Sequence, residues 1–166
     1  MRNTNDLHIV GFRIGAETFG VPIARVKEIV RVPAITAIPE APACVEGVIN
    51  LRGKIIPVVD LRKRFGEEAA APGKKSRILV AEAESKLVGL LVDSASEVLN
   101  IPRSAVEDPP DVFDEHDLRY VTGVGKLDSR LIILLDLTKV LEKGDLKRLG
   151  EITAQTQSAE TTVQVS

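Results

Sequence analysis

The feature that most constrains the fold of this chain is an internal repeat. Residues 47–65, with the sequence GVINLRGKIIPVVDLRKRF, return 76 positions later as GVGKLDSRLIILLDLTKVL. In this alignment Gly47 matches Gly123, and Asp60 matches Asp136. A unit that is repeated with the same apolar spacing predicts two structurally similar halves.

The repeat extends toward the N-terminus. Residues 9–33 match residues 78–102 with an offset of 69 positions, which aligns Gly20 with Gly89. The segment between the two matched blocks is seven residues longer in the second copy, so the two offsets differ by one loop insertion. The sequence-related units therefore span about 9–65 and 78–141, and residues 66–75 join them.

Each copy has the pattern of about five short strands followed by one short helix. Residues 47–51 and 54–59 read as strands around a tight turn at Arg52 and Gly53, and they are apolar or β-branched at nearly every position. This pattern is typical of strands that are buried on both faces or curled into a small barrel. Asp60 is suited to be the N-cap of the following helix. Because a closed barrel leaves no exposed edge, we expect an all-β fold with short helices, made of two pseudo-symmetric five-stranded β-barrels packed side by side.

Composition narrows the class of protein. Aromatic residues make up only 3% of the chain, so Val, Ile and Leu must fill the core, and the net charge of −2 gives no reason to expect a nucleic-acid or anionic-membrane partner. The single cysteine, Cys44, excludes an internal disulfide framework and fits a reducing cytosol. We see no signal peptide and no apolar window long enough to span a bilayer, so no direct membrane insertion is expected. Residues 1–6 and 153–166 are polar and are expected to be flexible and disordered, respectively.

The sequence contains no recognisable catalytic or metal-binding motif. His8 and His116 form no HExxH or other metal spacing, and Cys44 has no histidine near it in the sequence. The acidic stretch 107–118 lacks the alternating acids and the glycine of a calcium-binding EF-hand loop. P-loop, GxGxxG and GxSxG patterns are also absent. We therefore expect no enzyme activity, no cofactor and no metal.

Two other function classes stay open at this point. One is an orphan small β-barrel that binds nucleic acid or a small ligand, although four Phe, one Tyr and no Trp offer few surfaces on which bases could stack. The other is a metal-dependent hydrolase built on the acidic stretch, for which a rise in thermal stability with calcium or magnesium would be the signature.

Differences between the copies point to residues that the fold does not require. Residues 50–53, NLRG, become KLDS in the second copy, so the Arg52 guanidinium is not needed to close the turn. It is free to reach a carboxylate or carbonyl of a partner, or else it forms an internal salt bridge with Glu28 or Glu46. Val26 is replaced by Ala in the second copy, whereas Glu28 is kept, so we interpret Val26 as an exposed variable position. An apolar spot ringed by polar groups is typical of a protein–protein contact.

The stretches GVINLRGKIIPVVDLRKRFG, VGLLVDSASEVL and YVTGVGKLDSRLIILLDLTKVL resemble the CheW-like family, the coupling proteins of bacterial chemotaxis, over about residues 7–145. The resemblance implies a single CheW-like domain made of two SH3-like barrels. It also implies a non-enzymatic adaptor, active in signal transduction beside a two-component kinase. Such an adaptor couples the cytoplasmic tips of methyl-accepting chemoreceptors to the regulatory domain of the histidine kinase CheA, and it is cytoplasmic and recruited to membrane-associated arrays through its partners.

The resemblance implies two sets of contact residues. The expected receptor-binding residues are Val26, Glu28, Leu51 and Arg52. The expected kinase-binding residues are Ile23 and Gly47 from the first barrel and Val112 and Phe113 from the second.

Overall fold

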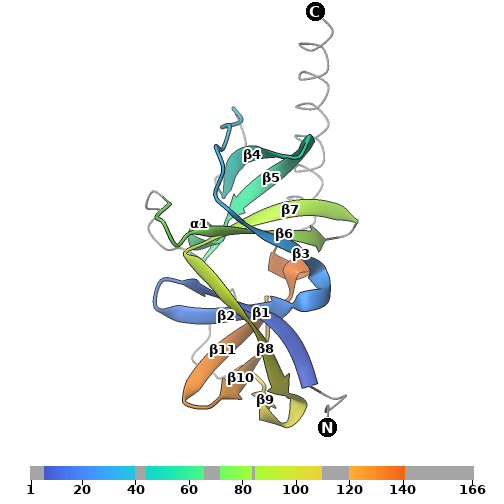
Figure 1. The fold of residues 1–166 in the computed structure, drawn as a ribbon. Coiled ribbons are helices and arrows are strands. Elements are labelled where there is room, and N and C mark those ends of the chain that lie inside the picture. The colour runs from blue at the N-terminus through green and yellow to red at the C-terminus, as the bar shows by residue number, and fades with distance from the viewer. Residues whose placement is uncertain (1–5, 40–43, 66–71, 84, 110–119, 141–166) are drawn as a thin grey trace, which may run out of the picture.

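The computed structural model describes residues 6–39, 44–65, 72–83, 85–109 and 120–140 of the chain (Figure 1). The first sequence repeat contains β1 (Asp6–Ile14), β2 (Glu17–Pro22), the 3₁₀ turn η1 (Ile23–Arg25), β3 (Val26–Arg31), β4 (Val45–Leu51), β5 (Lys54–Asp60) and α1 (Leu61–Arg64). The second contains β6 (Arg77–Ala83), β7 (Lys86–Val92), β8 (Ser94–Pro102), the 3₁₀ turn η2 (Arg103–Ala105), β9 (Val106–Glu107), β10 (Val121–Leu127), β11 (Arg130–Leu135) and α3 (Leu137–Val140).

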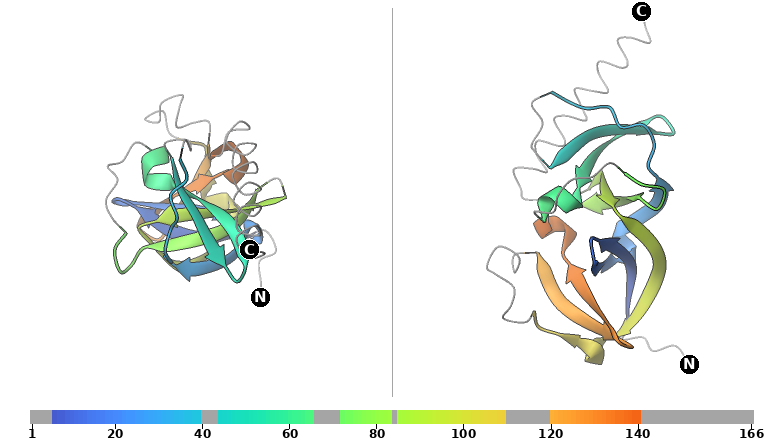
Figure 2. Two further views of the ribbon diagram at one scale, coloured as in Figure 1. Left: turned by 90° about the horizontal axis from the view of Figure 1, so that it is seen from above. Right: turned by 90° about the vertical axis from the view of Figure 1, so that its left-hand side faces the viewer.

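The strands form two sheets, one in each of two stacked lobes (Figures 1 and 2). The upper lobe of Figure 1 has the strand order β3-β6-β7-β5-β4, and the lower lobe has the order β8-β1-β2-β11-β10-β9. The sixth strand of the lower lobe, β9, has only two residues, and a single bridge between Thr36 and Val48 takes its place in the upper lobe. The expected class, two pseudo-symmetric five-stranded β lobes with short helices, is confirmed.

The two lobes do not coincide with the two sequence repeats. The β1–β2 hairpin of the first repeat pairs with β8 and β11 in the lower lobe, and the β6–β7 hairpin of the second repeat pairs with β3 and β5 in the upper lobe. Repeats 9–65 and 78–141 therefore do not each form a lobe by themselves, because each lobe is completed by the other repeat's first hairpin. The physical reason is that the β1–β2 and β6–β7 hairpins have matching apolar patterns, so either could pair with the remaining strands of either repeat. The repeat spacing shows which strands are equivalent, but not which repeat each hairpin pairs with.

The exchange gives the strands two buried faces. Along β6, Ile78 and Val80 point into the core of the upper lobe, whereas Leu79 and Ala81 point into a central core that both lobes share. β11 follows the same rule, with Ile132 inside the lower lobe and its neighbours alternating between the lower and central cores. Alternate side chains of a strand face opposite sides of the sheet, so two cores require apolar residues at every position. Of the two strands predicted to be buried on both faces or curled into a barrel, β5 is buried on both, with Ile56 and Val58 in the upper core and Val59 in the central core.

Aromatic side chains fill one side of the central core. Phe12 stacks on Phe19 with ring centres 6.0 Å apart, Phe19 stacks on Phe65 at 5.2 Å, and Phe65 tilts against Tyr120 at 5.7 Å. The positions that match Phe12, Phe19 and Tyr120 in the other repeat are Ala81, Val88 and Cys44. At each of these three pairs of equivalent positions, one copy thus contributes a large side chain to the shared core and the other a small one, which keeps its packing dense.

Several sequence predictions concern segments at the margins of the described residues. The segment 1–6 lies outside the description except for Asp6, which is the first residue of β1, and the tail 153–166 lies wholly outside it. Within the described ranges, no helix is both long enough and apolar enough to cross a membrane.

Candidate functional site

The β4–β5 hairpin turn carries the arginine that the sequence singled out. The two turn residues, Arg52 and Gly53, both have left-handed backbone angles, with φ of 52° and 87°. Positive φ at both central residues is the geometry of the two-residue turn that matches the natural twist of a hairpin. The Asn50 side chain supports the turn, since its Oδ1 accepts a hydrogen bond from the Gly53 N–H at 2.9 Å.

Arg52 forms an ion pair with Glu28 of β3. Arg52 Nη1 donates to Glu28 Oε1 at 3.2 Å, and Nη2 contacts Oε2, so the pair is bidentate. The hydrogen bond from Arg52 lowers the pKa of the Glu28 carboxyl below its ordinary value and raises the pKa of Arg52. Of the two internal partners considered from sequence, Glu28 is the one used, and Glu46 pairs with Lys63 instead. The Arg52 side chain nevertheless stays 71% exposed, so the guanidinium remains accessible.

The ion pair lies on the rim of a groove, which we call the Arg52 groove. It has a volume of about 490 Å³ and is lined by Lys27, Glu28, Leu51, Arg52, Lys54, Ile56, Val80, Glu82 and Leu87. Its floor is apolar, because Ile56 and Val80 are core residues of the upper lobe and the half-buried Leu51 and Leu87 pack against them. A second rim pair joins Lys27 Nζ to a Glu82 carboxylate oxygen at 3.1 Å. An apolar floor within a charged rim is the usual anatomy of a protein contact.

Val26 does not belong to this groove. Val26 lies opposite Ala81 and Glu28 lies opposite Val80, so two steps along β3 correspond to a single step along β6. Such a β-bulge at Lys27 places residues on either side of it on opposite faces of the sheet. Val26 is accordingly half-buried against the central core, whereas it was expected to be exposed beside Glu28.

The structure thus brings together three of the four expected receptor-binding residues. These are Glu28, Leu51 and Arg52. Sequence reasoning missed the groove residues that β6 and β7 supply, because these strands belong to the other repeat. The opposite charges of Lys27 on β3 and Glu82 on β6 are the one sign of this contact in the sequence. They can be matched to each other only once the exchange of hairpins is known.

The expected kinase-binding residues are scattered. Ile23 lies in η1 and is 41% exposed, so its side chain is available to a partner. Gly47 is buried in β4 with φ of 147°, and a Cβ atom there would lie 2.1 Å from the Thr36 carbonyl oxygen. Gly47 therefore lets the 32–39 segment approach β4, and its own contact with a kinase stays a prediction. Val112 and Phe113 lie outside the described residues.

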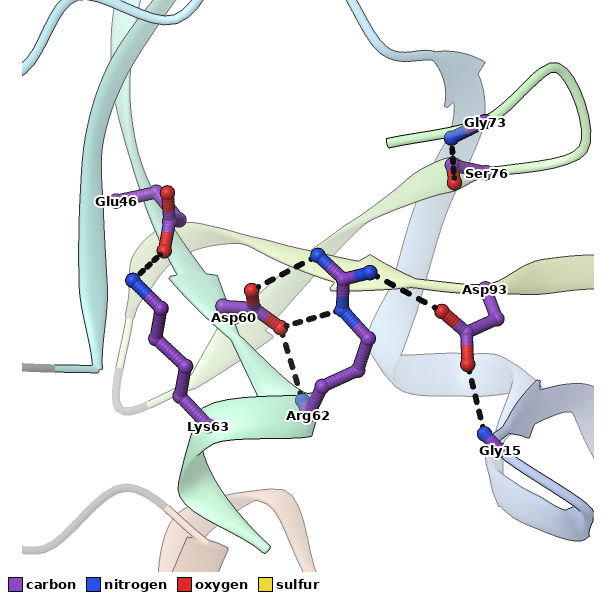
Figure 3. Close-up of polar contacts among 8 residues, drawn as sticks. All are labelled: Gly15, Glu46, Asp60, Arg62, Lys63, Gly73, Ser76 and Asp93. Atoms are coloured by element: carbon purple, nitrogen blue, oxygen red, sulfur yellow. Dashed lines mark hydrogen bonds and ion pairs between the residues drawn. The ribbon is translucent and has the colours of Figure 1, made fainter. Parts of the chain in front are cut away.

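A polar network, buried at Asp60 and Arg62 and partly exposed at Asp93, connects the two lobes near α1 (Figure 3). Asp60 caps α1 as expected, because its Oδ1 accepts from the Arg62 backbone N–H at 2.9 Å. The Arg62 side chain, only 7% exposed, donates to both Asp60 oxygens at 3.1 and 3.0 Å and to Asp93 Oδ1 at 3.4 Å. Asp93 Oδ2 in turn accepts from the Gly15 N–H at 2.7 Å, in the β1–β2 turn of the lower lobe. The hydrogen bonds with Asp60 raise the pKa of Arg62.

This Arg62 network, Asp60–Arg62–Asp93–Gly15, is a structural tie rather than a second binding surface, because its charged groups are paired internally. Within the described ranges, no group of three or more His, Cys, Asp or Glu side chains is arranged to hold a metal ion. The groove beside Arg52 is therefore the better candidate for function.

Comparison with known proteins places this architecture. The model of the CheW-like domain family matches residues 8–145. A probable chemotaxis protein CheW from Rhizobium etli is 37% identical over 135 residues, which cover 81% of this chain and 87% of that protein. Chemotaxis protein CheW from Rhizobium meliloti is 39% identical over 132 residues, with 80% and 85% covered. The crystal structure of the scaffolding protein TtCheW from Thermoanaerobacter tengcongensis superposes with a TM-score of 0.77 at 41% identity, covering 84% of this chain and 95% of that one.

Proposed function

The chain belongs to the CheW-like family and is a non-enzymatic chemotaxis adaptor, and on this basis we propose that it couples chemoreceptors to a CheA-type histidine kinase. In this proposal it binds the cytoplasmic signalling tip of a methyl-accepting chemoreceptor and the regulatory domain of the kinase. It works in the cytoplasm and reaches the membrane-associated array through these partners. Membership of this family favours the adaptor function over the two alternatives, an orphan nucleic-acid-binding barrel and a metal-dependent hydrolase.

The observation that carries the receptor contact is the exposed guanidinium of Arg52 above an apolar floor. Arg52 is held by Glu28 in one orientation, so less side-chain entropy is lost when a partner binds. Leu51, half-buried at the edge of the same floor, offers apolar surface beside the charge. A receptor segment that inserts an apolar side chain and presents a carboxylate or carbonyl to Arg52 would satisfy both features.

We assign the kinase contact to other surfaces, with Ile23 as its described anchor. Ile23 is exposed, lies in the corner between β2 and β3, and does not line the Arg52 groove, so both partners can bind at once. Val112 and Phe113 remain the proposed contribution of the second repeat. Two partners held by one adaptor gain effective concentration, and a signal then passes as a shift in the populations of the assembled states.

Arg52→Glu tests the receptor contact. The variant should weaken binding to a receptor signalling tip by about tenfold or more and leave binding to the kinase regulatory domain unchanged. Its melting temperature should stay close to that of the parent chain, because the pair with Glu28 is solvent-exposed. Binding to each partner can be measured separately by calorimetry.

Asp128→Arg is the matched control, because Asp128 occupies the equivalent turn of the β10–β11 hairpin with nearly the same backbone angle, φ of 56°. This charge reversal should leave receptor binding intact. Unfolding of Arg52→Glu, or equal loss of binding in both variants, would contradict the assignment of the receptor surface to the Arg52 groove.

A further inference from the structure

A second groove, which we call the basic groove, opens at the far end of β3 from Glu28. It has a volume of about 490 Å³ and is lined by Arg31, Val32, Pro72, Gly73, Lys74, Ser76 and Arg77. None of its described lining residues also lines the Arg52 groove. Three of its lining residues are cations, and Lys75 is exposed beside them. Nothing in the proposed receptor or kinase contacts uses this surface.

Two cations of the basic groove face each other across the sheet, and no described carboxylate pairs with them. Arg31 and Arg77 are directly opposite each other where β3 pairs with β6. Like charges at facing positions of neighbouring strands destabilise a sheet. Within the described ranges, no ion pair joins a carboxylate to Arg31, Arg77 or Lys74. A break of this kind in local charge pairing is expected where the charge serves a function.

The turn beside these arginines is fixed before any ligand arrives. The Gly73 N–H donates to Ser76 Oγ at 2.9 Å (Figure 3). The Ser76 N–H donates back to the Gly73 carbonyl at 3.1 Å. The Ser76 side chain that closes this turn is buried. Arg77 Nη1 adds bonds to the carbonyls of Lys74 and Ser76 at 2.9 and 2.7 Å. The two central positions of the turn are Lys74 and Lys75, so a rigid backbone presents both ammonium groups to solvent.

We propose that the basic groove binds an acidic segment of a protein partner. Guanidinium and ammonium groups recognise carboxylates, and two facing arginines suit neighbouring acidic side chains. A nucleic-acid strand is the weaker fit, because none of the described lining residues is an aromatic on which a base could stack, and the whole chain carries a net charge of −2. The adaptor would thereby hold a third surface, distinct from those for receptor and kinase.

The test uses the full chain and two fluorescent dodecapeptides, one of alternating Glu and Gly and one with Gln in place of every Glu. Fluorescence anisotropy should show binding of the Glu peptide at low salt, weakening as NaCl is raised, and binding of the Gln peptide at least about tenfold weaker. Arg31→Glu/Lys74→Glu should lower affinity for the Glu peptide about tenfold or more. Equal binding of the two peptides, or unchanged binding by the double variant, would overturn the proposal.

Arg103→Glu is the matched control, because Arg103 is an exposed cation of η2 in the lower lobe. It should bind the Glu peptide as the parent chain does. Glu67→Gln/Glu68→Gln removes the two carboxylates that most closely precede Pro72 in the sequence. This variant should bind the peptide equally or more tightly, and weaker binding would contradict a cationic site.

Stability gives an independent readout. Arg31→Glu places a carboxylate opposite Arg77, so its melting temperature should be equal to or above that of the parent chain, while its peptide affinity falls. A lower melting temperature would mean that Arg31 serves the fold.

Two further measurements decide the identity of the occupant. If the chain binds a single-stranded oligonucleotide as tightly as it binds the Glu peptide, the groove is assigned to nucleic acid. If the chain self-associates and Arg31→Glu/Lys74→Glu abolishes this, the groove is assigned to a second copy of the chain. Either result would overturn an acidic partner segment. Because receptor and kinase binding should be unaffected by the double variant, this proposal and the proposed coupling function can fail separately.

Discussion

The two equivalent hairpins of the lobes, β4–β5 and β10–β11, share a backbone and differ in charge. Each has a two-residue turn whose first residue is left-handed, with φ of 52° at Arg52 and 56° at Asp128. Aspartate is enriched at such angles, because its short polar side chain bonds locally, whereas arginine has no such advantage. Arg52 is therefore the less favourable choice for the turn itself. Its presence is better explained by what its guanidinium contacts beyond the turn.

The surroundings of the two turns also diverge. In the upper lobe Arg52 reaches Glu28 on the edge strand β3, above an apolar floor. In the lower lobe Lys126, one residue before Leu127, pairs instead with Glu107 of β9 at 3.0 Å. The same fold thus carries a cation at one tip and an acid at the other. The duplication supplies the scaffold, and the differences between copies mark where a partner can be recognised.

The largest effect on the free energy of unfolding should come from Gly47 and Gly123, the equivalent glycines of the first strands of the β4–β5 and β10–β11 hairpins. Gly47→Ala places a Cβ atom 2.1 Å from the Thr36 carbonyl oxygen, at a backbone angle that side chains rarely adopt, and should cost about 4 kcal/mol of unfolding free energy. Gly123→Ala meets its nearest atoms at 3.0 Å without a left-handed angle, and should cost about 1 kcal/mol. Urea denaturation of both variants measures the difference. Equal losses would mean that the two lobes hold their covering segments in the same way.

The next effect concerns the helices that follow β5 and β11. Asp60 and Asp136 both cap, but position 62 carries a buried arginine where the matching position carries Thr138. Arg62→Ala should cost about 3 kcal/mol, because it leaves the buried Asp60 carboxylate without its ion-pair partner. Thr138→Ala removes one hydrogen bond to Asp136, of 2.6 Å, and should cost about 1 kcal/mol.

Hydrogen exchange tests whether Arg62 links the two lobes or only stabilises the start of α1. In Arg62→Ala the Gly15 amide should exchange faster, because Asp93, its acceptor, loses Arg62. Unchanged protection at Gly15 alongside lower stability would confine the role of Arg62 to α1.

How far the sequence predicts this molecule depends on the range of the interactions involved. The strand pairs around Arg52, the cap at Asp60 and the duplication follow from local patterns and spacing, and the structure bears them out. The exchange of hairpins does not follow from them, because equivalent strands offer equivalent partners. Residue-level errors arise in the same way: a bulge at Lys27 turns Val26 inward, since one extra residue shifts every later side chain to the other face.

The candidate site was accessible from sequence only in part. Glu28, Leu51 and Arg52 could be named from asymmetry and resemblance, because they belong to one repeat. Val80 and Leu87 complete the groove from the other repeat, so no pattern within the first repeat could have found them. The burial of Arg62 was missed because a charged side chain next to other cations reads as a solvated surface.

A charge swap sharpens the comparison of the two turns with a smaller effect on stability. Glu28→Arg/Arg52→Glu retains an ion pair between β3 and the turn but reverses its orientation. If Arg52 itself contacts the receptor, the swap should bind the receptor tip as poorly as Arg52→Glu does, with an unchanged melting temperature. Restored binding in the swap would show that the pair serves only to shape the groove. Calorimetric titration of the three proteins distinguishes these outcomes.

The smallest effect is the pH dependence of the Glu28–Arg52 pair. Because Arg52 holds the pKa of Glu28 below its ordinary value near 4.5, the folded chain binds this proton less readily than the unfolded chain does. The pair therefore contributes stability above that pH, and the contribution is lost as pH falls through the lowered pKa of the folded state. NMR titration of the Glu28 side-chain carboxyl should give a lowered pKa that returns toward its ordinary value in Arg52→Gln and at high salt. Asp128→Asn, the matched change in the other turn, should leave that titration unmoved, and a shift there would mean that the two hairpin tips are not electrostatically independent.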